Sequence, residues 1–331
     1  MRALALIAVC LIGCVVASPR RNDDPLAGRT ICVDPGHGGT AEIDSYRVGP
    51  TGEREEWINL RVALMLRDIL EQRGAHVLMT RTEDVVVELQ DRAELAVANG
   101  AEVFLSIHHN ATADPEANFP VVYFHGSASE NRASVVLGRL VIASLAEALF
   151  NRETEVSLVS DHAIFPTAGA AVLRHSYGIP GIIGEASFFT NADEEERLRN
   201  PDHNRREAVA YVSALTEFFS RSTPPIHDKG SKVDVQPFEV LQEDDRTRAI
   251  ARRWKENWRA GVKAQEIGTP QALEEALEHF TLSARSFPDS WLAGDCHRRR
   301  GEICEALGRP EEAAMARLRA EEHYVPLARE F

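Results

Sequence analysis

The chain has 331 residues, 44% of them hydrophobic and 27% charged, so it is long enough for a sizeable core and for two domains. Its 51 acidic residues outnumber its 37 basic ones and give a formal net charge of −14. Nucleic acid and anionic membrane surfaces both require a basic protein surface, so we expect neither as the main partner of this chain.

Residues 1–18 predict an export signal. A short positively charged start precedes an apolar run at 3–13 that is too short to span a membrane. Two cleavage sites fit: Leu-Ile-Gly before Cys14 resembles a bacterial lipoprotein signal, and Val-Val-Ala before Ser18 resembles an ordinary signal. We expect an exported protein of the periplasm or cell envelope, whose only membrane contact would be a lipid on Cys14.

Between residues 29 and 221, apolar runs of strand length alternate with segments of helical periodicity. Strands are predicted at 31–33, 76–80, 103–107, 121–124 and 181–184, and helices at 55–73, 89–98, 133–149 and 207–219. This alternation is typical of an α/β fold. We expect a three-layer domain over 29–221, with a central, largely parallel sheet and helices on both faces.

The chain changes character after this domain. Residues 222–245 contain Pro-Pro and Gly-Ser pairs among mixed charges and are predicted to form a linker. Residues 246–331 show only helical patterns, and Glu-Glu-Ala at 274–276 recurs 37 positions later at 311–313. The pattern resembles two tetratricopeptide-like helical repeats, with a generic helical hairpin as the alternative. Two repeats bury little apolar surface, so we expect this small all-α region to pack on the first domain or on a partner.

Three residues of the first domain suit a metal site. His37 follows the strand at 31–33 within Asp-Pro-Gly-His-Gly-Gly, and His108 follows the strand at 103–107. Glu55 opens the first helix. Taken singly, they are a turn histidine, a core histidine and a helix-terminal charge. Together, two imidazoles and one carboxylate are typical ligands of hydrolytic zinc, and ligands of α/β sheets bind at strand ends.

Six segments resemble, in this order, the zinc-dependent N-acetylmuramoyl-L-alanine amidases (type-3 amidases) of bacterial cell walls. They are 34–39, 51–60, 80–81, 89–92, 106–111 and 184–191. The resemblance implies one Zn²⁺ ion held by His37, Glu55 and His108. It implies Glu185 as the catalytic acid and base. Arg174 lies in a Leu-Arg element similar to one of the family, and it is either a catalytic cation that stabilises the oxyanion or a structural salt-bridge partner.

The activity that this resemblance implies is hydrolysis, by a zinc-activated water, of the amide between N-acetylmuramic acid and the L-Ala of the stem peptide. The alternatives are another exported zinc amidohydrolase or carboxypeptidase, and a non-catalytic wall-binding scaffold that acts through the helical repeats. Retention of Glu185 speaks against the scaffold. We expect peptidoglycan as the substrate, a possible protein partner at the helical repeats, and no nucleic acid. The segment 114–120 departs from the family pattern, so we expect altered substrate contacts there.

Two of the implied ligands have neighbours of the same kind. His108 and His109 are adjacent on a strand and point to opposite faces, so only one can reach the metal, and the family motif selects His108. The motif also selects Glu55 over Glu56, which we expect to face solvent. His109 is left as a group close to the metal, a substrate contact or an exposed side chain. A histidine further along, at 175, is a weaker candidate for the neighbourhood of the metal.

Overall fold

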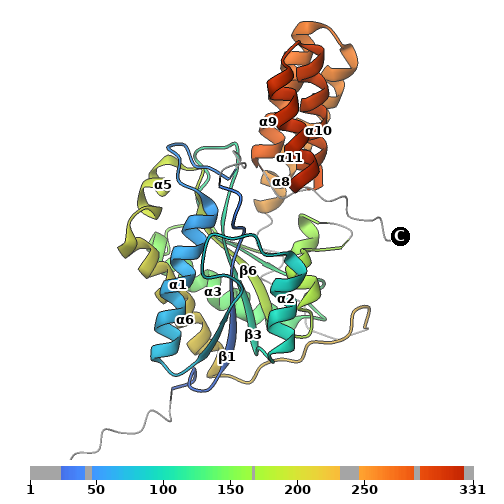
Figure 1. The fold of residues 1–331 in the computed structure, drawn as a ribbon. Coiled ribbons are helices and arrows are strands. Elements are labelled where there is room, and N and C mark those ends of the chain that lie inside the picture. The colour runs from blue at the N-terminus through green and yellow to red at the C-terminus, as the bar shows by residue number, and fades with distance from the viewer. Residues whose placement is uncertain (1–23, 42–46, 166–167, 232–245, 287–290, 324–331) are drawn as a thin grey trace, which may run out of the picture.

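The structure is a computed structural model that describes residues 24–41, 47–165, 168–231, 246–286 and 291–323. The expected export signal, with Cys14, lies outside these residues, as does most of the expected linker. Figure 1 shows an α/β part followed by a bundle of helices, which is the order that the sequence predicts.

A six-stranded sheet forms the centre of the α/β part. Its strands are β1 (Thr30–Pro35), β2 (His76–Met79), β3 (Val103–Asn110), β4 (Val121–Phe124), β5 (Ser157–Ser160) and β6 (Gly181–Phe188), in the order β2-β1-β3-β6-β4-β5. The neighbours β1–β2, β1–β3, β3–β6 and β4–β5 are parallel, and β4–β6 is antiparallel. The predicted largely parallel sheet is confirmed, with β5 as a strand that the sequence pattern did not predict.

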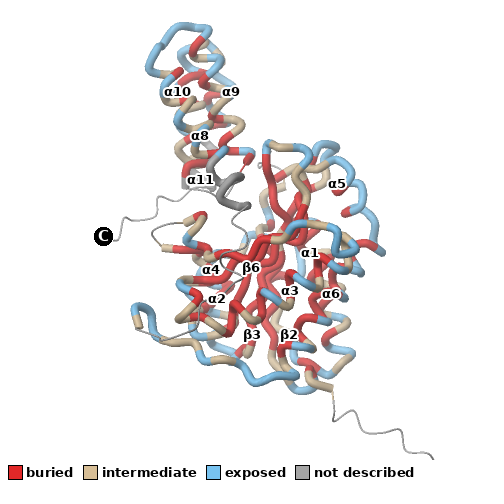
Figure 2. Tube along the Cα trace, turned by 180° about the vertical axis from the view of Figure 1, so that it is seen from behind, coloured by how far each residue is buried: buried red, intermediate tan, exposed pale blue. Residues whose placement is uncertain are grey.

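Helices cover both faces of the sheet, as predicted. They are α1 (Glu55–Gln72), α2 (Leu89–Ala98), α3 (Arg132–Phe150), the 3-10 turn η1 (Asp161–Ala163), α4 (Ala171–His175), α5 (Ala192–Leu198) and α6 (Pro201–Phe219). The helices α1, α3 and α6 bury the largest apolar core against one face, and α2 and α4 lie on the other (Figure 2). α6 begins earlier than predicted, because Asn200 caps it and proline suits its first turn.

One described helix, α3, has the length and hydropathy of a membrane span. Half of that segment is buried inside the protein, where α3 packs against α6, β4 and β6. Its apolar residues therefore serve the core of the α/β part, and its length and composition are those of a buried core helix as much as of a span.

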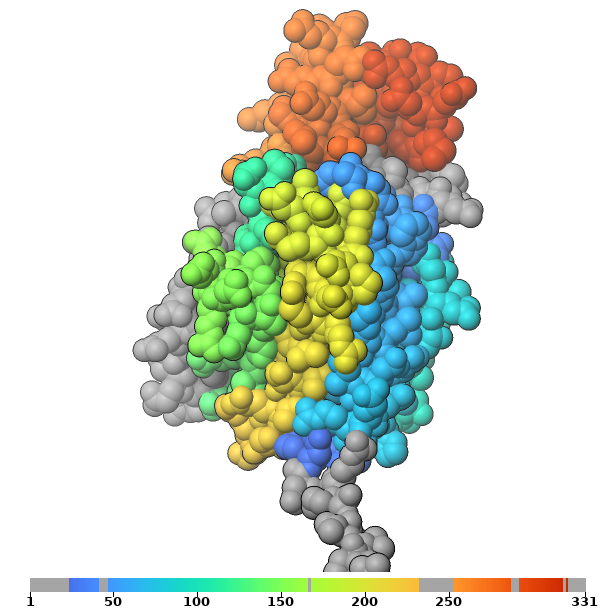
Figure 3. All heavy atoms as spheres, turned by 90° about the vertical axis from the view of Figure 1, so that its left-hand side faces the viewer, coloured from blue at the N-terminus to red at the C-terminus, as the bar shows by residue number. Residues whose placement is uncertain are grey.

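The helical region consists of α8 (Arg246–Ile267), α9 (Pro270–Ser286), α10 (Trp291–Ala306) and α11 (Pro310–His323). Each helix packs against the next one along the chain. The two Glu-Glu-Ala triplets lie in α9 and α11, and the tetratricopeptide-like assignment stays a prediction. Figure 3 shows this region, in orange and red, at one end of the α/β part.

A tryptophan joins the helical region to the sheet. Trp254 of α8 is 1% exposed and lies in one apolar cluster with Phe119, which precedes β4, and Phe188, which ends β6. An ion pair of 2.6 Å between Arg253 and Asp114 lies beside it. The expectation that the helices pack on the first domain is therefore met, and Trp254 is a fully buried part of that contact.

Replacing Trp254 with alanine should lower the free energy of unfolding by about 3–5 kcal/mol, because the change leaves a large cavity between the two parts. Urea titration of both proteins measures the difference. Met315→Ala is the control, since Met315 is 57% exposed on α11 and its removal should change stability by less than about 0.5 kcal/mol. Equal stabilities for the two variants would contradict the proposed importance of this contact.

Candidate metal centre and catalytic site

The loop that carries His37 is held by two buried arginines. Arg81 donates to the carbonyls of Pro35 and Gly36 at 2.9 and 2.8 Å. Arg92 donates to the carbonyls of Pro35 and His37 at 2.9 and 2.7 Å. His37 has a φ of 58°, in the left-handed region that side chains other than glycine rarely occupy. The arginine contacts stabilise this strained backbone and so fix the position of the imidazole.

The three predicted zinc ligands converge on one point. Oε1 of Glu55 lies 3.0 Å from Nε2 of His37 and 3.0 Å from Nδ1 of His108. One ligand atom from each residue lies within 4.8 Å of the other two. Gly36 makes room for His108, because a Cβ at Gly36 would lie 2.2 Å from the imidazole. Two imidazoles and one carboxylate at this spacing fit a zinc ion and leave one position for water.

Glu185 on β6 lies beside His108 on the neighbouring strand β3. The two residues are partners in the parallel register of β3 and β6, so their side chains emerge on the same face. Burial alone would lower the pKa of His108, but the hydrogen bond to Glu55 and the charges of Glu185 and Glu55 raise that pKa to about 9. Burial and the charge of Glu185 also raise the pKa of Tyr123. Glu185 is therefore within electrostatic reach of the ligand set.

Glu56 does not face solvent, so that prediction was wrong. Its side chain is fully buried and pairs with the guanidinium of Arg54 at 2.7 Å. The partner lies only two positions earlier in the chain, just before α1 begins. An ion pair buried at the start of the helix directs Glu56 away from the ligand set and leaves the neighbouring Glu55 to face the two histidines.

His109 belongs to a buried network behind the ligand set. The amide of Asn59 donates to Oε1 of Glu55 at 3.2 Å and to the carbonyl of Gly36 at 3.3 Å. Both partners are acceptors, so Oδ1 of Asn59 accepts from Nδ1 of His109, 2.9 Å away. Nε2 of His109 lies 3.1 Å from Glu207 on α6. Of the three roles left open for His109, the one close to the metal site therefore fits best, because it orients Asn59.

Arg174 lies on α4, and its described contacts are with the chain before that helix and with the neighbouring His175. Its guanidinium donates to the carbonyls of Ala168 and Gly169 at 3.1 and 3.2 Å, and it lies 3.5 Å from Nε2 of the exposed His175. Within the described part of the chain, these hydrogen bonds reach neither the ligand set nor Glu185. The catalytic role of Arg174 stays a prediction.

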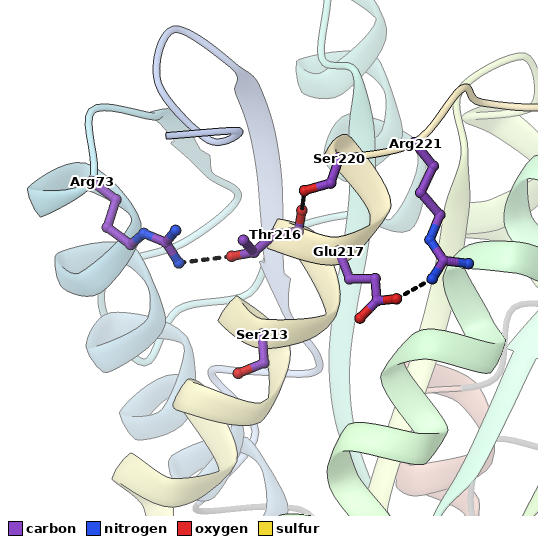
Figure 4. A pocket seen from close by; sticks show the side chains of 6 residues that line it. All are labelled: Arg73, Ser213, Thr216, Glu217, Ser220 and Arg221. Atoms are coloured by element: carbon purple, nitrogen blue, oxygen red, sulfur yellow. Dashed lines mark hydrogen bonds and ion pairs between the residues drawn. The ribbon is translucent and has the colours of Figure 1, made fainter. Parts of the chain in front are cut away.

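A separate open hollow lies where α1 and α6 end (Figure 4). It is lined by Arg73, Ser213, Thr216, Glu217, Ser220 and Arg221. Arg73 donates to Thr216 at 2.7 Å, and Arg221 pairs with Glu217. These charged groups satisfy one another, and the hollow lies at the opposite end of α1 from Glu55, so it adds nothing to the candidate site.

Comparison with known proteins gives a consistent result. The sequence model of the N-acetylmuramoyl-L-alanine amidase family matches residues 31–217. The N-acetylmuramoyl-L-alanine amidase AmiA of Salmonella typhimurium is 30% identical over 223 residues, which cover 58% of this chain and 76% of AmiA. The solved amidase AmiC2 of Nostoc punctiforme is 27% identical with a TM-score of 0.51, covering 59% of this chain and 99% of AmiC2. The amidase of Clostridium difficile 630 is 26% identical with a TM-score of 0.51, covering 58% and 97%.

Gly36→Ala should abolish zinc binding, because the added Cβ would overlap the imidazole of His108 and displace it. Metal content after dialysis against zinc measures the effect. Gly181→Ala is the matched control, since a Cβ there meets its nearest atoms at 3.5 Å, an ordinary contact, and should leave zinc binding unchanged. Full zinc content in Gly36→Ala would show that His108 is not held as described.

Asn59→Leu should weaken zinc binding by about 10–100-fold, because it removes the amide that orients Glu55 while keeping a side chain branched at the same carbon. Competition with a chromophoric chelator measures the dissociation constant. Asn99→Leu, at the exposed C-terminal cap of α2, makes the same chemical change outside the network and should bind zinc normally. Equal affinities for the two variants would rule out an orienting role for Asn59.

Proposed function

The chain belongs to the N-acetylmuramoyl-L-alanine amidase family, and from this premise we propose that it cleaves peptidoglycan with one zinc ion held by His37, Glu55 and His108. The bond cleaved is the amide between N-acetylmuramic acid and the L-Ala of the stem peptide. The observation that carries the zinc proposal is the convergence of three ligand atoms within 4.8 Å beside Glu185. These groups come from the ends of β1 and β3, the start of α1 and the middle of β6.

The chemistry needs an activated water and a proton donor for the leaving amine. Zinc at this site would supply the first by lowering the pKa of a bound water and would polarise the scissile carbonyl. Glu185 would accept the proton of the attacking water and deliver it to the amine nitrogen. We retain Arg174 in the proposal as a cation for the developing oxyanion, beside its described contacts with loop carbonyls.

We also propose a location and a division of the chain that suit this activity. The substrate lies outside the cytoplasmic membrane, which requires export, and residues 1–18 would direct it. Cys14 would carry a lipid if the first cleavage site is used. The catalytic domain would occupy 29–221, the linker 222–245 and the tetratricopeptide-like region 246–331. The helical region would offer its remaining surface to a protein partner.

The test is digestion of purified peptidoglycan by the mature chain, with analysis for free stem peptides that begin with L-Ala. We expect their release to stop when a chelator removes the metal. Glu185→Gln should lower the rate by at least about 10²–10⁴-fold, since the variant cannot transfer the proton. The same variant should keep its bound zinc, because Glu185 lies outside the proposed ligand set.

Glu196→Gln is the control for this substitution. Glu196 is exposed on α5, so the variant should digest peptidoglycan like the native chain. Release of stem peptides by Glu185→Gln at the native rate would remove Glu185 from the mechanism. A zinc-loaded native chain that releases no such peptide from any wall preparation would point to another amide substrate or to a required activator.

A further inference from the structure

A second group of potential metal ligands lies at the opposite end of the sheet from the candidate zinc centre. His125 follows β4 and Asp161 follows β5, and these two strands are parallel neighbours. β4 runs antiparallel to β6 and places Phe124 opposite Ile182, at the beginning of β6. Glu185 lies further along β6, toward the end of the sheet that carries the candidate zinc centre. The second group is therefore separate from the catalytic site.

We propose that His125, Asp161 and His162 form a second site for a divalent metal, best suited to a borderline ion such as Zn²⁺. One ligand atom from each residue lies within 4.8 Å of the other two. Nδ1 of His125 is 2.7 Å from Oδ2 of Asp161, and Nε2 of His162 is 3.9 Å from Oδ1. As in the candidate catalytic centre, the donors are two imidazoles and one carboxylate; there, both histidines lie 3.0 Å from the same carboxylate oxygen.

The inner half of this site is preorganised. His125 is 2% exposed and Asp161 is 1% exposed. The carboxylate of Asp161 is oriented by the backbone amides of Ala170 at 2.7 Å and Gly126 at 3.3 Å. Gly169 packs closely against the pair, because a Cβ there would lie 2.5 Å from Nδ1 of His125 and 2.5 Å from Oδ2 of Asp161. Two ligands held in place before binding reduce the entropy that a metal must overcome.

His162 is the outer ligand. Its side chain is 43% exposed, and its ring centroid lies 5.6 Å from that of His125. An exposed imidazole can rotate, which would close the 3.9 Å separation and leave a coordination position open to water. The alternative is a purely structural pair, in which Lys229, whose ammonium interacts with the charge of Asp161, balances the carboxylate.

A metal at this site would join the two chain segments that leave β4 and β5. Gly169, which lies against the buried pair, also accepts a hydrogen bond from Arg174 at 3.2 Å. The metal would therefore stabilise the chain that leads into α4. This gives the second ion a structural role, distinct from the hydrolytic role of the first.

The test is the zinc stoichiometry of the mature chain after removal of all metal and dialysis against zinc. We expect about two ions per native chain and about one for His162→Ala, which loses an exposed ligand and should fold normally. His37→Ala should also hold about one ion, now at the second site, and the double variant none. His76→Ala, an exposed histidine at the start of β2, is the control and should keep both ions.

Cobalt absorption gives a second measurement. Co²⁺ bound to His37→Ala should show visible bands from the second site, and these should disappear in the double variant. One ion in the native chain together with none in His37→Ala would overturn the second site while leaving the catalytic centre intact. Two ions in His162→Ala would equally overturn it. One ion in the native chain that persists in His37→Ala and is lost in His162→Ala would instead count against the catalytic centre.

Discussion

The buried carboxylate of Asp34 supports the loop on which the candidate zinc centre depends. It accepts hydrogen bonds from Arg92 at 2.9 Å and from the hydroxyls of Ser106 and Thr80 at 2.6 Å each. Burial opposes its charge, but Arg92 and the two hydroxyls lower its pKa below the ordinary value. The charge of Asp34 in turn stabilises the buried guanidinium of Arg92, which reaches the end of β1 from α2. That guanidinium donates to the carbonyl of His37, so one ion pair stabilises the left-handed backbone of a predicted metal ligand.

Glu55 is fixed from two directions. Before α1, the carboxylate of Glu195 on α5 accepts from the amides of Thr51 and Glu53 at 2.8 and 2.9 Å, which sets where the helix begins. Within α1, Asn59 lies one turn later and donates to Glu55 itself. A carboxylate in the first turn is also favoured by the helix dipole. The ligand therefore sits on a rigid element, which a catalytic metal requires of its protein.

The sequence predicted which residues come together at the candidate site better than it predicted their surroundings. His37 and His108 each follow an apolar run that is long enough to mark a strand, so their positions at strand ends could be read directly. The elements that the pattern missed, β5, α4 and α5, have four, five and seven residues, too few to show a clear periodicity. The burial of Glu56 was missed because its ion pair with Arg54, two positions earlier, determines it rather than any periodic pattern.

The network behind the ligands could not be predicted for a different reason. His109 meets Glu207, 98 positions away, and the contact depends on how α6 packs against α1, which itself packs against β3. A single sequence carries no sign of such a pairing, because each residue alone looks like an ordinary polar position. The Asn four residues after Glu55 was the one visible signal, since that spacing places the two side chains on the same face of a helix.

The segment 114–120, which departs from the family pattern, contacts the helical region. Asp114 pairs with Arg253 of α8, and the chain just before it, at Ala113, donates to Oγ of Ser286 on α9 at 3.2 Å. The same segment also contacts β6, because Asn118 accepts from the amide of Phe188 at 3.1 Å. It begins four residues after the end of β3, the strand that carries His108. One short segment therefore contacts both the helical region and the strand that bears Glu185.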